Sequence, residues 1–140
     1  MTNYGNYVVT DKGSKSVKIF DPDGEIVAEF GPHLASPWGV CSNSNGEVLV
    51  TDTTHKAVFV HDNIGNLKFQ VKAPNDLMVF PEYVCSNKDN DIVVSDFKGN
   101  SIHVFNAVGQ YLFRIQSSIP NNGKFSFFLC TLTLSAYIQG

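Results

Sequence analysis

The sequence contains an internal repeat, and this feature limits the possible folds more than any other. The segment VVTD, which ends at Asp11, returns as LVTD at Asp52 and as VVSD at Asp96, with a period of about 40 residues. Two apolar residues follow each aspartate six and eight positions later. A glycine follows thirteen positions later in every copy, at Gly24, Gly65 and Gly109. A fixed period of this length is typical of proteins built from stacked structural repeats.

Each repeat divides into four short runs of strand length. In the central copy the runs cover residues 39–43, 47–51, 57–60 and 67–71. Turn signals separate them, including NG at Asn45, ND at Asn90 and DPDG at Asp21, and the last of these suits a type I turn followed by a bulge. The segments between the runs show no helical periodicity, and a β-sandwich would not need identical units. We therefore expect an all-β fold: a partial β-propeller of about three four-stranded antiparallel blades.

The repeated segments also resemble a known family. The central copy reads PWGV from Pro37, NGEVLVTD from Asn45 and VFV from Val58, and this pattern resembles the NHL repeat. The third copy, with IVVSDF from Ile92 and IHVF from Ile102, is similar to the NHL domains of tripartite-motif (TRIM-NHL) E3 ubiquitin ligases. The resemblance covers roughly residues 5–115. It implies that the chain is a fragment of a six-bladed ring that forms the substrate-binding or RNA-binding end of such a protein.

The copies depart from the family pattern in three places. The first copy lacks the opening strand, Tyr83 stands where the pattern has glycine, and residues 127–140 replace the start of another blade with an apolar stretch. We expect an incomplete first NHL blade at 1–30, a second at 31–71, a third at 72–115, and a connector with an atypical apolar tail at 116–140. We interpret this tail as non-native propeller sequence from a gene-model or splice fragment. Uncovered blade edges favour self-association of the isolated chain.

Charge and composition restrict the partners. The net charge of −3 creates no global basic field, and the sequence has a single arginine, Arg114, so nucleic-acid binding would need a local patch. The N-terminus has no basic region followed by an apolar run, which predicts a cytoplasmic protein. The apolar stretch at 125–138 is shorter than the ~20 residues that span a bilayer, so we expect no membrane association.

The repeated aspartates and the histidines are candidate metal or acid sites with a simpler structural explanation. Asp11, Asp52 and Asp96 end a strand, where aspartate commonly accepts hydrogen bonds from the N–H groups of the next turn. We therefore assign them, with the three repeated glycines, a structural role. The four histidines occupy different repeat positions, whereas a convergent metal site would use equivalent ones. We expect no metal, no cofactor and no catalytic residue. The four histidines are His33, His55, His61 and His103.

The topology of a blade separates the charges. Loops between the second and third strands share one face with the connectors between blades, and the other turns lie on the opposite face. Seven residues on the connector side form the predicted partner-binding set: Lys12, Lys15, His55, Lys56, Lys72, Phe97 and Lys98. Lys124 and His33 fall on the same side. The opposite side carries seven acidic residues: Asp21, Asp23, Glu25, Glu47, Asp62, Asp89 and Asp91. Variable loops on a rigid scaffold commonly bind ligands.

These features favour a binding module over an enzyme. By resemblance, the chain is expected to be the substrate-recognition part of a TRIM-NHL-type ligase, without a counterpart of the RING in its 140 residues, and its connector side is expected to bind a protein. RNA is the alternative partner, with lysines on phosphates and Phe97 or His55 stacking on bases. A metal-dependent lyase of NHL-like fold is a more distant alternative.

Overall fold

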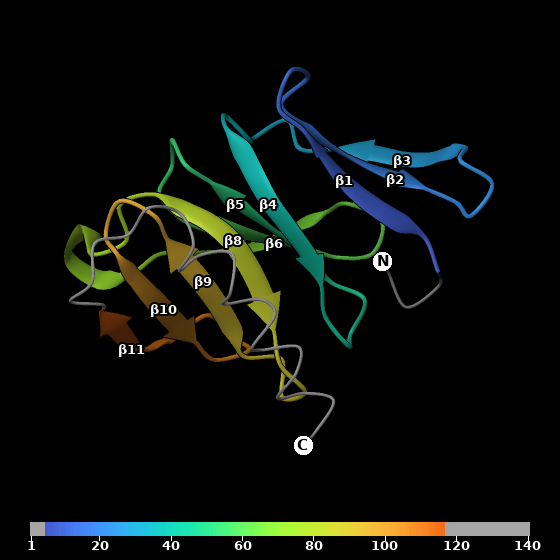
Figure 1. The fold of residues 1–140 in the computed structure, drawn as a ribbon. Helices are drawn as coiled ribbons and strands as arrows, with labels where there is room; N and C mark the ends of the chain where they lie inside the picture. The colour runs from blue at the N-terminus through green and yellow to red at the C-terminus, as the bar shows by residue number, and fades with distance from the viewer. Residues whose placement is uncertain (1–4, 117–140) are drawn as a thin grey trace.

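The structure, a computed structural model, describes residues 5–116 and consists of three antiparallel sheets that follow one another in chain order (Figure 1). Blade 1 contains β1 (Tyr7–Asp11), β2 (Ser16–Phe20) and β3 (Ile26–Phe30). Blade 2 contains β4 (Pro37–Ser42), β5 (Val48–Asp52), β6 (Ala57–His61) and β7 (Leu67–Val71). Blade 3 contains β8 (Pro81–Ser86), β9 (Ile92–Asp96), β10 (Ser101–Phe105) and β11 (Tyr111–Gln116). The predicted all-β partial propeller is confirmed.

The strand limits differ slightly from the expected ones. The first strand of blade 2 begins at Pro37 rather than at Gly39, because Pro37 already pairs with Asp52 and a register shift lies between Pro37 and Val40. A short 3₁₀ turn, η1 (Pro74–Asp76), lies in the connector between blades 2 and 3. The predicted connector and tail from residue 117 onward, with Lys124, lie outside the described residues.

The outer hairpin of every blade has the same geometry. A register shift interrupts the pairing next to Phe20, His61 and Phe105. The glycine that ends each following turn has a positive φ, of 89°, 95° and 90° for Gly24, Gly65 and Gly109. Side chains other than glycine rarely adopt this conformation, which explains the repeated glycine.

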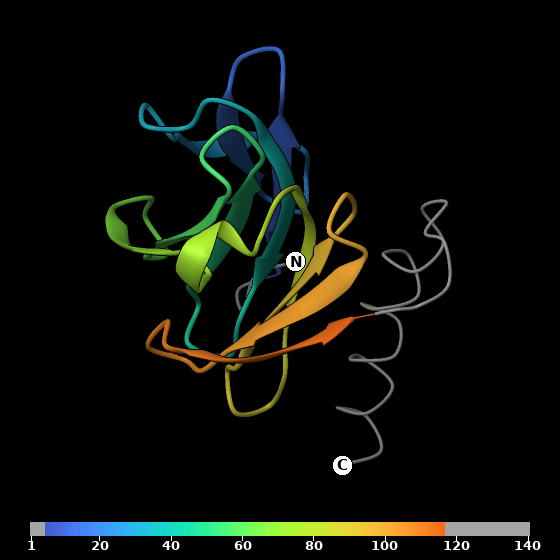
Figure 2. The ribbon, with the colours of Figure 1, turned by 90° about the vertical axis from the view of Figure 1, so that its left-hand side faces the viewer.

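Blade 2 is packed on both of its faces. One core, with Val48, Val50 and Phe59, lies between blades 1 and 2, and a second, with Leu49 and Phe105, lies between blades 2 and 3. Successive side chains of a strand point to opposite faces, so the run Val48–Val50 serves both cores. Every residue of β5 and β6 is therefore buried. In Figure 2 strands β9–β11 of the third sheet (orange) fan out at an angle from the other two sheets.

Threonine hydroxyls join the inner strands of neighbouring blades. Thr10 Oγ1 donates to the Trp38 carbonyl at 2.8 Å, and Thr51 Oγ1 donates to the Glu82 carbonyl at the same distance. The two threonines precede the repeated aspartate in their copies. The strands approach closely enough that a Cβ on Gly39 would collide with the backbone at Glu82. The same contact thus recurs at both blade interfaces.

The turn glycines receive the outer strand of the preceding blade. A Cβ on Gly65 would lie 2.6 Å from the ring of Phe30, and one on Gly109 would lie 3.2 Å from the ring of Phe69. Nothing in the described part of the chain comes within 4 Å of the equivalent position on Gly24. Each blade therefore has a glycine socket on one side and an outer-strand knob on the other. Among the described residues, no helix is long and apolar enough to cross a membrane.

Candidate interaction face

Two ends of the propeller can be defined from the strand directions. The connector face consists of loops 12–15, 53–56 and 97–100 with connectors 31–36 and 72–80. The turn face, at the opposite ends of the strands, consists of the hairpin turns 21–25, 43–47, 62–66, 87–91 and 106–110.

The repeated aspartates hold the connector face together. Asp52 Oδ2 accepts the backbone N–H groups of Ala35 and Ser36, at 2.7 and 3.1 Å, and Asp52 Oδ1 accepts that of His55. One carboxylate therefore fastens a connector to the neighbouring loop. These hydrogen bonds hold the pKa of the buried Asp52 carboxyl below its usual range, although burial opposes them.

Asp96 repeats this arrangement in blade 3. It accepts backbone N–H groups from Val79 and Phe80 in the connector and from Gly99 in the loop. It also accepts a hydrogen bond from His103, whose Nε2 lies 3.1 Å from Oδ2. Hydrogen bonds from these groups lower the pKa of Asp96 against the effect of its burial. Both aspartates are fully engaged in holding the backbone of the connector face.

Asp11 differs from the other two because it pairs with a lysine. Its Oδ2 lies 2.5 Å from Lys18 Nζ, and its carboxylate accepts the backbone N–H of Ser14. The hydrogen bond from Lys18 is the main cause of a pKa well below the usual range for Asp11. No connector from a preceding copy lies on Asp11 within the described residues.

Aromatic and lysine side chains cross the connector face through all three blades. Lys12 Nζ of blade 1 lies 3.0 Å from the centre of the Trp38 ring, and Trp38 meets Phe80 of the next connector edge-on at 5.5 Å. Phe80 in turn meets Phe97 at 6.3 Å, and Lys98 Nζ lies 5.1 Å from the Phe80 ring. We call Trp38, Phe80 and Phe97 the aromatic row. An ammonium group above the face of an aromatic ring is attracted to the ring by a cation–π interaction.

The aromatic row offers both apolar surface and positive charge. Phe97 is 36% exposed and Trp38 and Phe80 are half-buried, while Lys12 and Lys98 are exposed. Glu82 lies close enough for Lys12 to lower its pKa, but burial is the larger influence and raises it. This combination suits a ligand that presents carboxylates beside apolar groups.

The predicted partner-binding residues fall into two groups. Lys12, Phe97 and Lys98 belong to the aromatic row or lie on it. The remaining four have other surroundings. Lys15 and Lys56 are exposed at left-handed backbone positions with φ of 54° and 53°, and Lys72 is exposed at the start of its connector. His55 packs edge-on against Phe59 at 5.4 Å.

The sequence alone did not identify Phe80 or Trp38 as residues of this face. The two residues occupy different repeat positions, Trp38 after its proline and Phe80 before its proline, so the periodicity did not reveal them. Their adjacency to Pro37 and Pro81, where a connector enters an inner strand, is the signal that marks them as residues of this face.

Two of the histidines meet although their repeat positions differ. His33 Nε2 lies 2.8 Å from His61 Nε2, and His61 Nδ1 lies 3.2 Å from the Val48 carbonyl. Burial lowers the pKa of His61 to about 4 and also lowers that of His33, so both rings are neutral at pH 7. Within residues 5–116, no group of three or more histidine, cysteine or acidic side chains is arranged to hold a metal ion. Burial raises the pKa of the Cys41 thiol to about 12, which keeps it protonated.

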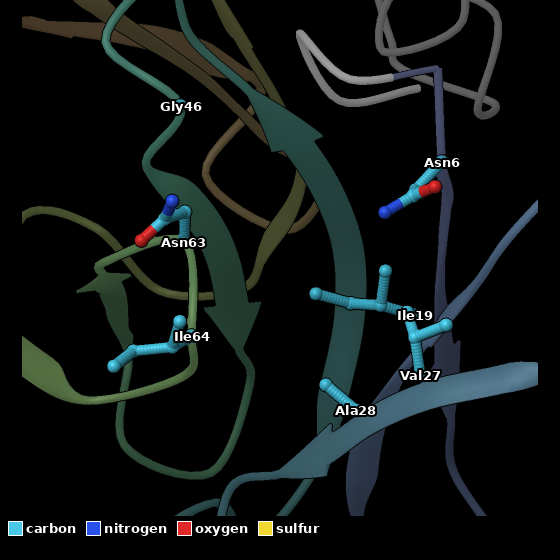
Figure 3. A pocket seen from close by; sticks show the side chains of 7 residues that line it. All are labelled: Asn6, Ile19, Val27, Ala28, Gly46, Asn63 and Ile64. Atoms are coloured by element: carbon cyan, nitrogen blue, oxygen red, sulfur yellow. The ribbon is translucent and has the colours of Figure 1, made fainter.

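The turn face contains a cleft between blades 1 and 2 (Figure 3). Its volume is about 220 Å³. Blade 1 lines it with Asn6, Ile19, Val27 and Ala28, and blade 2 lines it with Gly46, Asn63 and Ile64. Figure 3 shows the two sets of residues on either side of the opening, with Ile19 extending toward blade 2.

Comparison with known proteins identifies the repeat. The family model described as NHL repeat matches residues 34–60. Human E3 ubiquitin-protein ligase NHLRC1 is 40% identical over 52 residues, which are 37% of this chain and 13% of that protein. The Caenorhabditis elegans B-box type zinc finger protein ncl-1 is 33% identical over 65 residues, covering 45% of this chain and 8% of that protein. The chain thus spans a small part of the curated relatives it matches.

Solved structures agree on the architecture. Virginiamycin B lyase from Staphylococcus aureus superposes with a TM-score of 0.74 and 18% identity, over 88% of this chain and 41% of that one. The WD40 β-propeller domain of Doa1 superposes with a TM-score of 0.68 and 12% identity, over 84% and 38%. At such identities the likeness establishes the propeller fold alone. With the matched repeat and the three sheets, the chain carries an NHL-repeat domain that resembles those of TRIM-NHL ubiquitin ligases.

Proposed function

We propose that this NHL-repeat domain is a protein-interaction module that recognises the substrate of a TRIM-NHL-type ubiquitin ligase through its connector face. The aromatic row is the observation that supports this role most directly, because it joins loops of three blades into one surface with lysines above two of its rings. The relatives that are ubiquitin ligases support the link to substrate recognition.

The chemistry of the row favours an acidic and apolar segment of a protein. Lys12 and Lys98 present ammonium groups for carboxylates, and the exposed part of Phe97 offers apolar contact area. Aromatic residues surrounded by a polar rim are typical of the central part of protein interfaces. The aspartates that fasten connector to loop keep this surface organised before binding, which lowers the entropic cost of association.

RNA fits the same surface less well. Base stacking needs free aromatic faces, but Lys12 covers one face of Trp38 and the rings of the row meet edge-on. His55, the other predicted stacking residue, packs against Phe59. We therefore favour an acidic peptide over RNA as the ligand of this surface, and the experiment below distinguishes the two.

The chain's single tryptophan provides the test. Trp38 fluorescence is recorded while the full chain is titrated with an acidic peptide, acetyl-Asp-Leu-Glu-Leu-Asp-amide, and separately with a single-stranded uridine octamer. We expect the peptide to change the fluorescence and Lys98→Glu to weaken its affinity about tenfold, because a repulsive charge replaces an attractive one. Arg114→Glu, with the same charge change on β11 outside the face, is the control and leaves the affinity within about twofold.

The result also distinguishes the two partner classes. Uridine-octamer binding that falls steeply with added salt and is lost in Lys98→Glu would assign the face to RNA instead. Equal peptide affinity in the wild type, Lys98→Glu and Arg114→Glu would remove the connector face from the proposal.

A further inference from the structure

The cleft of Figure 3 becomes informative when it is compared with the equivalent place between blades 2 and 3. Counting from the repeated aspartates, Ala28 of blade 1 corresponds to Phe69 of blade 2. Phe69 packs against the core between blades 2 and 3 and lies against Gly109. A phenyl ring thus fills the second interface at the point where the first has only the methyl group of Ala28.

A size exchange along the outer strand explains why blade 1 tolerates the small residue. Two positions after Ala28 stands Phe30, where blade 2 has Val71. Phe30 reaches Gly65, as Phe69 reaches Gly109, so each glycine socket still receives an aromatic ring. The ring in blade 1 comes from the later position, and the earlier position is left open as the cleft.

The rim of the cleft is open for a related reason. In blade 2 an ion pair between Lys68 and Glu47 crosses the equivalent position. The corresponding residues of blade 1 are Val27 and Asn6, which cannot form one. Val27 is 53% exposed and Ile64, on the opposite wall, is 70% exposed. Apolar groups thus line the cleft and also stand at its entrance, with the amide of Asn63 beside them.

Negative charge predominates in the two outer turns beside the cleft. The two outer turns next to it, 21–25 and 62–66, carry four carboxylates and no basic residue. They are Asp21, Asp23, Glu25 and Asp62. Hydrogen bonds from the backbone and side chain of Asn66 lower the pKa of Asp62, so it remains ionised at neutral pH. A ligand at this cleft gains from positive charge on either side of its apolar group.

We propose that the cleft between blades 1 and 2 binds the phenyl ring of a phenylalanine in a basic peptide segment of a partner protein. The site lies on the turn face, opposite the connector face, and does not depend on the function proposed for that face. The cleft is large enough, since an apolar cavity of roughly 150 Å³ holds a benzene molecule. Asn63 is placed to hydrogen-bond the peptide backbone, and the surrounding carboxylates attract the flanking lysines or arginines.

The test uses the peptide acetyl-Lys-Phe-Lys-amide on the full chain labelled with ¹⁵N. We expect saturable shifts of the backbone amide signals of Gly46, Asn63 and Ile64. Acetyl-Lys-Ala-Lys-amide, without the ring, should bind at least tenfold more weakly. Acetyl-Phe-amide, without the lysines, should bind about threefold more weakly. Trp38 fluorescence should stay constant, which separates this site from the connector face.

Two variants convert the first cleft toward the second. Ala28→Phe supplies the missing ring and should abolish the shifts, while Val27→Lys, at an exposed position, should weaken peptide binding at least fivefold even if Ala28→Phe does not fold. Ala107→Phe is the control, because it adds the same ring to an exposed turn of blade 3 away from the cleft. Unchanged affinity in both cleft variants would overturn the proposal, as would equal binding of the peptides with and without phenylalanine.

Discussion

The two blade interfaces share their inner contacts and differ in their outer ones. Near the inner strands, Thr10 and Thr51 make the same hydrogen bond to the next blade. Toward the outside, the first interface has His61 and an open cleft, and the second has Phe105 and the ring of Phe69 at the corresponding positions. Contacts directed at the backbone repeat because every junction must satisfy the same groups. The packing of side chains can differ from one interface to the next, and these differences create distinct sites.

The largest expected effect comes from opening the second interface. Phe69→Ala removes the ring that packs on Gly109 and should lower the free energy of unfolding by about 3 kcal/mol. Chemical denaturation monitored by circular dichroism measures the change. Leu67→Ala, at a 45% exposed position of the same strand, is the matched control and should cost much less. Equal losses in the two variants would show that Phe69 does not close this interface.

A pH titration should separate the two interfaces. His61 has a pKa of about 4 in the folded chain against 6.5 when exposed, so the unfolded state binds the proton first as the pH falls. Its stabilising contribution is complete above about pH 6.5 and should decline by about 3 kcal/mol toward pH 4. His33 changes in the same direction, whereas the lowered pKa values of Asp52 and Asp96 act at lower pH.

His61→Phe, which installs the residue found at this position in blades 1 and 3, tests the assignment. Thermal unfolding between pH 7 and pH 4 should become markedly less pH-dependent in this variant. If the slope in this window is retained, the pH sensitivity arises elsewhere in the chain.

Two glycines with the same backbone conformation isolate the packing of a blade against its neighbour. Gly65→Ala and Gly24→Ala meet the same strain of a positive φ, but only the Cβ at residue 65 collides with a ring, that of Phe30. Gly65→Ala should therefore be the more destabilising by 1 to about 2 kcal/mol. Urea denaturation of both variants gives the difference, and identical values would mean that Phe30 moves aside at no cost.

The inner contact that the two interfaces share should contribute to stability at both, and more at the second interface. Thr51→Val removes a buried hydroxyl that donates to Glu82 and accepts the Gly39 N–H group, and should cost about 2 kcal/mol. Thr10→Val removes the hydrogen bond to the Trp38 carbonyl and should cost about 1 kcal/mol. Guanidinium denaturation would reveal the ranking, and a larger loss for Thr10→Val would contradict it.

The repeat predicted the fold because each strand and turn position has a local physical cause. The turn glycines follow from a required positive φ, and the unbroken apolar run of β5 follows from burial on both of its faces. The aromatic row and the cleft were not predicted, since both depend on residues that break the repeat. Trp38 and Phe80 meet only after a connector brings the start of β8 beside β4. The cleft exists because blade 1 has the small residue first and the large one second, Ala28 and Phe30, where blade 2 has Phe69 and Val71. This difference becomes visible only when two copies are compared.

The glycine socket and the outer-strand knob give the propeller a direction. Within residues 5–116 no side chain occupies the socket at Gly24. At the other end, Phe113 and Ile115 on β11, at the positions of Phe69 and Val71, are each 51% exposed. Because these two surfaces differ and fit each other, contact between them is head-to-tail, and such an assembly either closes into a ring or continues as a spiral. Any blade that packs against either end must therefore have the same orientation as the three blades described.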